Sequence, residues 1–339
     1  MGSGNLTARA GGPQGLTQGL TRGPRPGPVP EAALSGPEEA ALAGRLRAHV
    51  EHLASDIGER HLFRPGSLEA AADYVAGQWS ALGLAVRRQA FLARGLPCAN
   101  LEVELGGVEL GGEGGGPGPI LVVGAHYDSL EGCPGANDNA SGVAVLLELA
   151  RELRGRLGPA PSRRVRLVAF ANEEPPFFRT PEMGSAVYAA RAWQRREPIV
   201  GALVLETVGY YSDAPGSQRY PPPLSMLHSH RGDFVAFVAN LRSRLWLRQA
   251  ARAFRRQGLL PLEDVATLTA IPGVAWGDQR SFWQAGYRAL MVTDTALYRY
   301  PWYHSPEDTP DKLDYRRLAR LCRALAGTVA ELAGAPGRR

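Results

Sequence analysis

Short apolar runs, each about the length of one strand, recur through the central and C-terminal parts of the chain. Each run is rich in valine, leucine, isoleucine or alanine and is followed by polar or glycine-rich residues. Continuous apolar runs of this length are typical of strands that are buried on both faces. The predicted buried strands lie at 120–123, 163–170, 199–205 and 289–293.

Helical spacing of apolar residues fills the segments between these runs. Strands that alternate with helices predict an α/β fold, in which helices cover both faces of a largely parallel sheet. We therefore expect three layers, α/β/α, around a mixed and mostly parallel central sheet. The predicted helices are 67–82, one that opens at Ser141 and ends near Leu157, 184–195 and 315–332.

Two regions depart from this alternation. Residues 1–35 are rich in glycine, proline, threonine and arginine without periodicity, which predicts a disordered leader before a single domain at 36–335. Residues 210–262 contain a proline triplet and an arginine-rich stretch. For them we predict an insertion with a long helix at about 233–256.

Local signals also define the N-terminal half of the domain. Ser35-Gly-Pro-Glu has the composition of a helix start, with the serine as N-cap. Residues 85–105 alternate well enough for two strands that turn at Gly95. The glycine-rich stretch 111–119 predicts a hairpin connection from these strands into the strand at 120–123.

Composition narrows the class of protein. The formal net charge is +5, but Lys312 is the only lysine among 38 basic residues, and the arginines alternate with acidic and apolar residues. This pattern indicates compositional bias rather than a surface that binds nucleic acid. The three cysteines are an odd number without CxxC spacing, which argues against a disulfide framework and against a cysteine zinc site.

Targeting signals are not apparent in the sequence. No apolar run approaches the ~20 residues that a membrane-spanning helix needs. The N-terminal segment lacks the apolar core of a signal peptide. We therefore expect a cytoplasmic protein that has neither a membrane nor a nucleic acid as its partner.

Histidines and acidic residues stand where the predicted strands end. Ligands of open α/β sheets bind beyond the carboxyl ends of the strands. Two histidines with several carboxylates, and no suitable cysteine, form the donor set of a hydrolytic zinc centre. These residues are His126, Asp128, Asp138, Glu173, Glu174, Glu206 and His304.

Each such residue has an ordinary structural explanation when it is taken alone. His126 can be a packed histidine at a strand end, and Asp138 between two asparagines suits an Asx turn. Glu173-Glu174 suits an exposed acidic loop, and Asp278 can cap the short helix that follows it. Their shared position after successive strands favours a metal site.

Four motifs, taken in order, resemble the co-catalytic zinc aminopeptidase family, which includes bacterial leucyl aminopeptidases, glutamate carboxypeptidases and glutaminyl cyclases. The resemblance covers about residues 45–332. It implies a zinc-exopeptidase fold and a peptide or small amide as substrate. The motifs are HYDS at 126–129, GANDNASG at 135–142, ANEEPPFF at 171–178 followed by MGS, and YHSPEDTPDKL at 303–313.

The resemblance also implies roles for the strand-end residues. His126 and His304 would each bind one of two zinc ions, and Asp138 would bridge the two ions. Glu174 would complete the His304 site. Glu173, beside it, would be the general base.

Three further residues receive supporting roles from the same resemblance. Asp128 would orient His126, as metal-bound histidines generally require. Tyr303 would donate a hydrogen bond to the developing oxyanion. Asp278 stands where relatives place an Asp-His pair, although the histidine is replaced by Gln279 in this chain.

One position departs from the family pattern. Relatives supply the remaining ligand of the first zinc with an aspartate, in a pattern like Leu-Asp-Met-Val-Gly. This chain has Leu-Glu-Thr-Val-Gly, with Glu206 at that position. Glutamate binds metal as well, but its extra methylene displaces the carboxylate. We expect two zinc ions, and Glu206 leaves one ion open as the alternative.

Three functions are consistent with this sequence. The first is a zinc-dependent metallopeptidase, most simply an aminopeptidase that removes N-terminal residues by attack of metal-activated water. The second is a single-zinc acyltransferase of the glutaminyl cyclase kind. The third is a catalytically inactive binding module with the same fold. The retained histidines and acidic residues favour the first.

Overall fold

Eight strands form one sheet in the part of the chain that this computed structural model describes, residues 36–106, 118–157, 161–221 and 230–334. Their order across the sheet is β1-β2-β4-β3-β5-β8-β6-β7. The strands are β1 (Arg87–Ala93), β2 (Leu96–Leu105), β3 (Ile120–His126), β4 (Arg164–Phe170), β5 (Ile199–Leu205), β6 (Val235–Asn240), β7 (Leu262–Thr267) and β8 (Ala289–Thr293).

Parallel pairing dominates the centre of the sheet. β3 lies parallel to β4 on one side and to β5 on the other, and β5 lies parallel to β8. β1 and β2 add antiparallel strands at one edge, and the β6–β7 pair joins β8 in the antiparallel sense at the other. The predicted mixed, mostly parallel sheet is confirmed.

Helices and short helical turns connect most of these strands. The α-helices of the described residues are α1 (Pro37–Glu51), α2 (Ser67–Ala81), α3 (Gly142–Arg154), α4 (Gly184–Gln194), α5 (Arg244–Gln257), α6 (Gln279–Gln284) and α7 (Tyr315–Leu332). The short turns are η2 (His52–Ile57), η3 (Ala136–Ser141), η5 (Leu241–Ser243), η6 (Ala296–Tyr298) and η7 (Pro310–Lys312).

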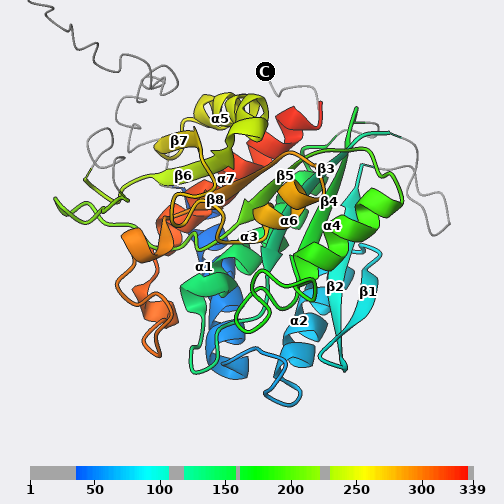
Figure 1. Ribbon diagram of the computed structural model, residues 1–339. Helices are drawn as coiled ribbons and strands as arrows, with labels where there is room; N and C mark the ends of the chain where they lie inside the picture. Colours follow the sequence, from blue (N-terminus) through cyan, green and yellow to red (C-terminus); the bar gives the residue numbers. More distant parts are fainter. Residues whose placement is uncertain (1–35, 107–117, 158–160, 222–229, 335–339) are drawn as a thin grey trace, which may run out of the picture.

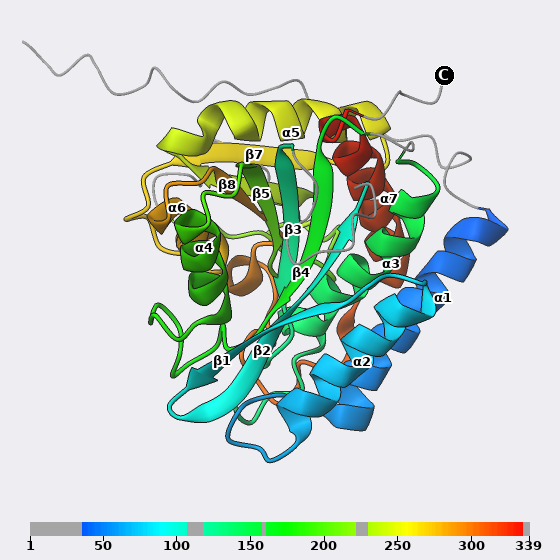
Figure 2. The same ribbon diagram turned by 90° about the vertical axis from the view of Figure 1, so that its right-hand side faces the viewer.

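The helices cover both faces of the sheet (Figure 1, Figure 2). On one face, α1, α2, α3, α5 and α7 share a core with Leu121 and Val123 of β3. On the other face, α4 and α6 pack against Ile120 and Val122. Alternate residues of a strand point to opposite faces, so the continuous apolar run of β3 contributes to both cores. The predicted three-layer α/β/α architecture is confirmed.

The prediction of a long helix at about 233–256 is wrong in its first part. Residues Val235–Asn240 form β6, and the helix α5 begins only at Arg244. The run VAFVAN is too short for periodicity to distinguish a strand from a helix. Its pairing with β7 and β8 places it in the sheet, inside the segment that the sequence assigns to an insertion.

The predicted hairpin into β3 is also wrong. β2 pairs with β4, and β3 lies on the other side of β4, so the two strands are not neighbours. Most of the connecting stretch 111–119 lies outside the described residues, as do the predicted leader and Ser35. The N-cap residue of α1 is Gly36. Among the described helices, none combines the length and the apolar character that crossing a membrane requires.

Candidate metal centre

The carboxyl ends of three neighbouring parallel strands bring most of the predicted site residues together. β3 ends at His126, β5 ends one residue before Glu206, and β4 ends three residues before Glu173. The loop after β3 adds Asp138 in the turn η3, and the loop after β8 adds His304. Parallel strands end at the same edge of a sheet, which is why residues so distant in sequence converge here.

Two groups of potential metal ligands share Asp138. His126, Asp138 and Glu206 offer ligand atoms that all lie within 4.8 Å of one another, and so do Asp138, Glu174 and His304. The Nε2 atom of His126 lies 3.3 Å from Oδ1 of Asp138, whereas Nε2 of His304 lies 3.1 Å from Oδ2. Each oxygen of the shared carboxylate therefore faces a different histidine.

The third member of each group completes a compact set of donors. Oε2 of Glu206 lies 3.5 Å from Nε2 of His126, and Oε2 of Glu174 lies 3.4 Å from Nε2 of His304. Imidazole nitrogens and carboxylate oxygens in groups of this size are the ligands of catalytic zinc sites.

Several buried nitrogen and oxygen atoms of this site lack a hydrogen-bond partner among the described residues, which bears on whether a cation would fit here. Nε2 of His126, both carboxylate oxygens of Asp138, Oε1 of Glu174 and Oε2 of Glu206 are buried and make no hydrogen bond among the described residues. A buried polar atom without a partner costs free energy, and a native fold rarely keeps several of them together unless something else satisfies them. Metal ions would satisfy these donors, so the residues fit the cofactor that the sequence predicts.

The protonation behaviour of the carboxylates supports the same conclusion. Burial raises the pKa of Glu206 to about 8 and that of Glu174 to about 7, and the negative charge of Asp138 adds to both shifts. Burial also raises the pKa of Glu173 well above its ordinary value. Acidic groups crowded into a buried site hold their protons unless cations neutralise them.

Glu206, the residue that departs from the family pattern, reaches the site because the chain makes room for it. A Cβ atom on Gly277 would lie 3.2 Å from Oε2 of Glu206 and 2.7 Å from Oε1 of Gln279. A glycine at this position therefore admits two longer side chains side by side. The two departures from the family pattern, Glu206 and Gln279, meet at this glycine.

Asp128 supports the site in two ways. Its Oδ1 atom lies 3.5 Å from Nδ1 of His126, as expected for a carboxylate that orients a metal-binding histidine. Its two oxygens also accept hydrogen bonds, each 3.0 Å long, from the backbone N–H groups of Glu173 and Glu174. One carboxylate thus fixes the end of β3 relative to the loop after β4.

Tyr303 and Asp278 lie around the two groups without belonging to them. The ring of Tyr303 stacks on that of His304 with centroids 3.9 Å apart, and Tyr303 and Glu206 both line a small adjoining cavity. Asp278 is fully buried, and burial raises its pKa to about 6. Its side chain does not cap α6, and neither carboxylate oxygen has a hydrogen-bond partner among the described residues.

Sequence reasoning missed Asp308, which holds the Asp138 loop. Oδ1 of Asp308 accepts a hydrogen bond from the backbone N–H of Asn137 at 2.8 Å, and Oδ2 accepts one from that of Asp138 at 3.1 Å. The hydroxyl of Tyr300 donates to Oδ1 at 2.7 Å. Asp308 lies within the same YHSPED motif as His304, so the motif itself was the signal.

Sequence reasoning also missed Arg60, for which the sequence offers no local signal. Its side chain is fully buried, and every acceptor of its guanidinium among the described residues is a backbone carbonyl. Two of these carbonyls belong to the loop that leads into η3, and one follows β3 directly. The acceptors are the carbonyl oxygens of Tyr127, Leu53, Gly58, Pro134 and Gly135, at 3.0, 3.0, 2.9, 2.6 and 2.9 Å.

Comparison with known proteins connects this geometry to a family. The model of "Peptidase family M28" matches residues 108–329. The Uncharacterized protein YfbL of Escherichia coli (strain K12) is 38% identical over 298 residues, which are 85% of this chain and 88% of that protein.

Solved structures share the fold at low sequence identity. BSAP, a zinc aminopeptidase from Bacillus subtilis, superposes with a TM-score of 0.65 at 16% identity, over 86% of this chain and 94% of its own. The glutaminyl cyclase of Fimbriiglobus ruber superposes with a TM-score of 0.64 at 21% identity, over 85% and 94%. The resemblance that the four motifs indicate is confirmed. The chain belongs to peptidase family M28.

Proposed function

We propose that this family M28 member is a zinc-dependent aminopeptidase that removes N-terminal residues from peptides. The observation that carries the proposal is the pair of ligand groups that share Asp138. Family membership makes the chain a peptidase. The exopeptidase activity and the metal are the inferred parts.

Two zinc ions suit the donor set better than one. His126, Asp138 and Glu206 would hold one ion, and Asp138, Glu174 and His304 the other. When bound, such ions lower the pKa of a water molecule and polarise the scissile carbonyl. Because Glu206 stands within reach of His126, its extra methylene does not remove the ligand that would complete the first site.

Glu173 is the general base of the proposed reaction. Its backbone is fixed by Asp128, its side chain is buried beside the ligand groups, and burial raises its pKa well above the ordinary value. A carboxylate with a raised pKa accepts a proton from the attacking water more readily and returns it to the leaving amine. Glu173 would perform both proton transfers.

Tyr303 would donate a hydrogen bond from its phenol hydroxyl to the substrate oxygen that becomes negatively charged. Burial and the charges of Asp138 and Glu206 raise the pKa of its phenol well above the ordinary value. The hydroxyl therefore stays protonated at neutral pH. A protonated phenol can donate to the oxygen on which negative charge develops in the transition state.

The small cavity beside Glu206 and Tyr303 would receive the side chain of the first substrate residue. It has a volume of about 100 Å³, and most of its wall is apolar. An apolar recess of this size favours uncharged side chains over acidic ones. Its walls include Val274, Trp276 and Met291.

The experiment that tests the proposal measures metal content and activity together. Elemental analysis of the purified protein is expected to give about two zinc per chain, because two ligand groups are present. A panel of aminoacyl-nitroanilides is expected to be hydrolysed, leucyl and methionyl substrates faster than glutamyl ones. EDTA should abolish turnover and lower the melting temperature, and added Zn²⁺ should restore both.

Other outcomes would point to the other two functions. One zinc per chain, with ammonia released from a peptide that begins with glutamine, would replace the proposal by the cyclase function. Bound zinc without turnover of either substrate class would indicate a binding module. Absence of bound metal after reconstitution with Zn²⁺ would refute the metal centre itself.

A further inference from the structure

A second cavity lies at the opposite end of the central strands from the metal centre. It has a volume of about 710 Å³ and includes Ile120, the first residue of β3, whereas His126 at the other end of β3 belongs to the metal centre. Strands rise about 3.3 Å per residue, so the two sites are separated by about 20 Å. We call this space the arginine cavity.

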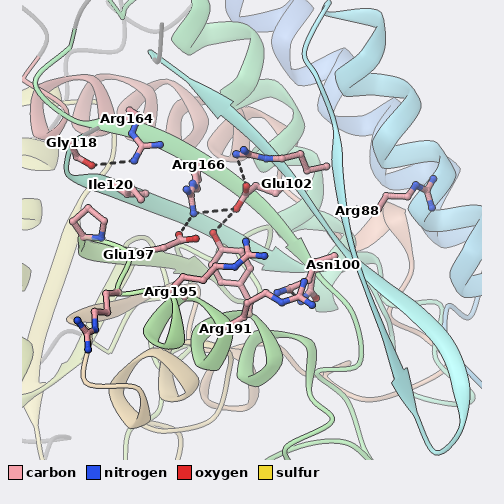
Figure 3. A pocket seen from close by; sticks show the side chains of 16 residues that line it. Arg88, Asn100, Glu102, Gly118, Ile120, Arg164, Arg166, Arg191, Arg195 and Glu197 are labelled. Carbon is pink, nitrogen blue, oxygen red and sulfur yellow. Dashed lines mark hydrogen bonds and ion pairs between the residues drawn. The ribbon is translucent and has the colours of Figure 1, made fainter. Parts of the chain in front are cut away.

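Arginine is the dominant side chain of the arginine cavity (Figure 3). Seven of the sixteen lining residues are arginine. Four of them form ion pairs with Glu102, Glu104, Glu197 or Asp73, which leaves three arginines without an ion pair among the described residues. Strand residues form one wall, and α4 with the residues that follow it forms the other. The arginines are Arg87, Arg88, Arg164, Arg166, Arg191, Arg195 and Arg196.

The strand wall holds its arginines in fixed positions. Arg164 and Arg166 on β4 are only 7% and 5% exposed. Nη1 of Arg164 lies 2.9 Å from both oxygens of Glu104, and Nε of Arg166 lies 2.8 Å from one of them. Figure 3 shows Arg166 between the carboxylates of Glu102 and Glu197, with which it forms ion pairs. Buried arginines are rare, and these two are held by ion pairs with carboxylates.

The helix wall carries arginines that are not neutralised. Arg191, Arg195 and Arg196 are exposed at the carboxyl end of α4, and none forms an ion pair with any of the described carboxylates. On the facing wall, the buried Nε of Arg164 also lacks a hydrogen-bond partner among the described residues. The helix wall therefore presents unpaired guanidinium groups to this space, whereas the Nε atom of Arg164 is buried behind the strand wall.

The dipole of α4 explains only in part why three exposed arginines lie at its carboxyl end. Cations near the carboxyl end of a helix interact favourably with its dipole, which would stabilise each of the three exposed arginines separately. The dipole gives no reason for them to face two buried arginines across a cavity. A bound anion would neutralise the three exposed arginines of the helix wall.

We propose that the arginine cavity binds a small molecule that carries two or more phosphate groups. Guanidinium groups match phosphate oxygens in paired hydrogen bonds, and the three uncompensated charges of Arg191, Arg195 and Arg196 exceed what one monoanion neutralises. The volume falls in the range of small-molecule sites. Because the cavity is far from the metal centre, this binding does not depend on peptidase activity.

Isothermal titration of the full-length, zinc-loaded chain tests the proposal. Fructose 1,6-bisphosphate serves as the probe, glucose 6-phosphate as the single-phosphate comparison and tricarballylate as the carboxylate comparison, all at the ionic strength of the cell. Saturable binding of the bisphosphate is expected, at least tenfold tighter than that of either comparison compound.

Two triple variants with the same change of charge decide where the probe binds. Arg191→Gln, Arg195→Gln, Arg196→Gln should weaken bisphosphate binding at least tenfold. Arg244→Gln, Arg248→Gln, Arg252→Gln removes three exposed arginines from α5, outside the cavity, and should leave the affinity unchanged. Thermal melts of both variants should remain single cooperative transitions, because all six residues are exposed.

Three results would overturn the proposal. The first is that the bisphosphate does not bind saturably. The second is that the two triple variants weaken binding equally, which would reduce the effect to overall charge. The third is that tricarballylate binds as tightly as the bisphosphate, which would remove the preference for phosphate. Removal of zinc by the phosphate probe would also produce a heat signal. That signal would persist in the Arg191→Gln, Arg195→Gln, Arg196→Gln variant, which distinguishes it from binding in the arginine cavity.

Discussion

The Oε2 atom of Glu206 lies only 3.2 Å from the position that a Cβ atom would occupy on Gly277. Gly277 also has φ of +140°, a conformation that other residues adopt with strain. The glutamate that replaces the family's aspartate is therefore accommodated by a second position more than 70 residues away in sequence.

Gly277→Ala should consequently damage the metal site. The added methyl group would displace Glu206 or Gln279, so we expect loss of one zinc per chain and a destabilisation of about 1–3 kcal/mol. Elemental analysis and urea unfolding measure the two effects. Gly286→Ala is the matched control: its φ is +87°, but its Cβ would meet no atom of the described residues within 4 Å. Equal zinc loss in both variants would show that the loss does not come from the contact of the new methyl group with Glu206 or Gln279.

Glu173→Gln should separate catalysis from metal binding. The amide keeps the size of the side chain but cannot accept the proton of the attacking water, so kcat should fall by about 10²–10⁴-fold. Zinc content should remain unchanged, because Glu173 belongs to neither ligand group. Loss of zinc together with activity would show that Glu173 is a ligand and not the base.

Asp128→Asn should weaken metal binding from outside the ligand groups. An amide retains one acceptor oxygen, so one of the two backbone N–H groups of Glu173 and Glu174 loses its partner. His126 loses its negatively charged neighbour at the same time. We expect metal affinity to fall about 10–100-fold, measured by competition with a zinc chelator. Asp311→Asn, at an exposed carboxylate, should have no effect.

Glu104→Gln should give a pH-dependent loss of stability. Burial alone would raise the pKa of Glu104, but hydrogen bonds from Arg166 and Arg164 outweigh burial and hold that pKa below the ordinary 4.5. A lowered carboxyl pKa stabilises the fold above the unfolded-state value, and this stabilisation disappears as the pH falls through the folded-state value.

The variant should therefore unfold more easily at pH 7, by about 1–3 kcal/mol. The difference from the unchanged chain should shrink toward zero below pH 4.5, the ordinary value for this carboxyl group. Urea titrations at a series of pH values measure it. Glu69→Gln, at an exposed position, is the control. A difference that stays constant with pH would show that packing, not charge, is responsible.

The sequence predicted the elements whose signals are local. The apolar run of β3 is buried at every position, and α7 has the bounds that its periodicity predicts. Local composition did not identify β6, because a run of five apolar residues and one asparagine becomes a strand only through pairing with β7 and β8. The hairpin prediction failed for the same reason, since β4 separates β2 from β3.

The candidate site likewise combines features that local sequence predicts with features that depend on contacts between distant segments. His126 and Glu206 stand at the ends of neighbouring parallel strands, and Asp138 lies in the loop after β3, so topology predicts that all three lie at the same edge of the sheet. The room that Gly277 provides for Glu206 depends on a close approach between distant segments, and no periodicity reveals it. The sequence raised the question of whether Glu206 reaches the site, but only the three-dimensional arrangement addresses it.

Arg60 lies outside the segment that the family model matches, but it holds a loop inside that segment. The family match begins at residue 108, yet the carbonyls of Tyr127, Pro134 and Gly135 inside that match depend on a donor 48 residues before its start. A fragment cut at the family boundary would keep every proposed ligand and lose the side chain that ties the ligand-bearing loop to the N-terminal helices. The segment ahead of the match therefore helps to hold the candidate metal centre in place, although it contributes no ligand to it.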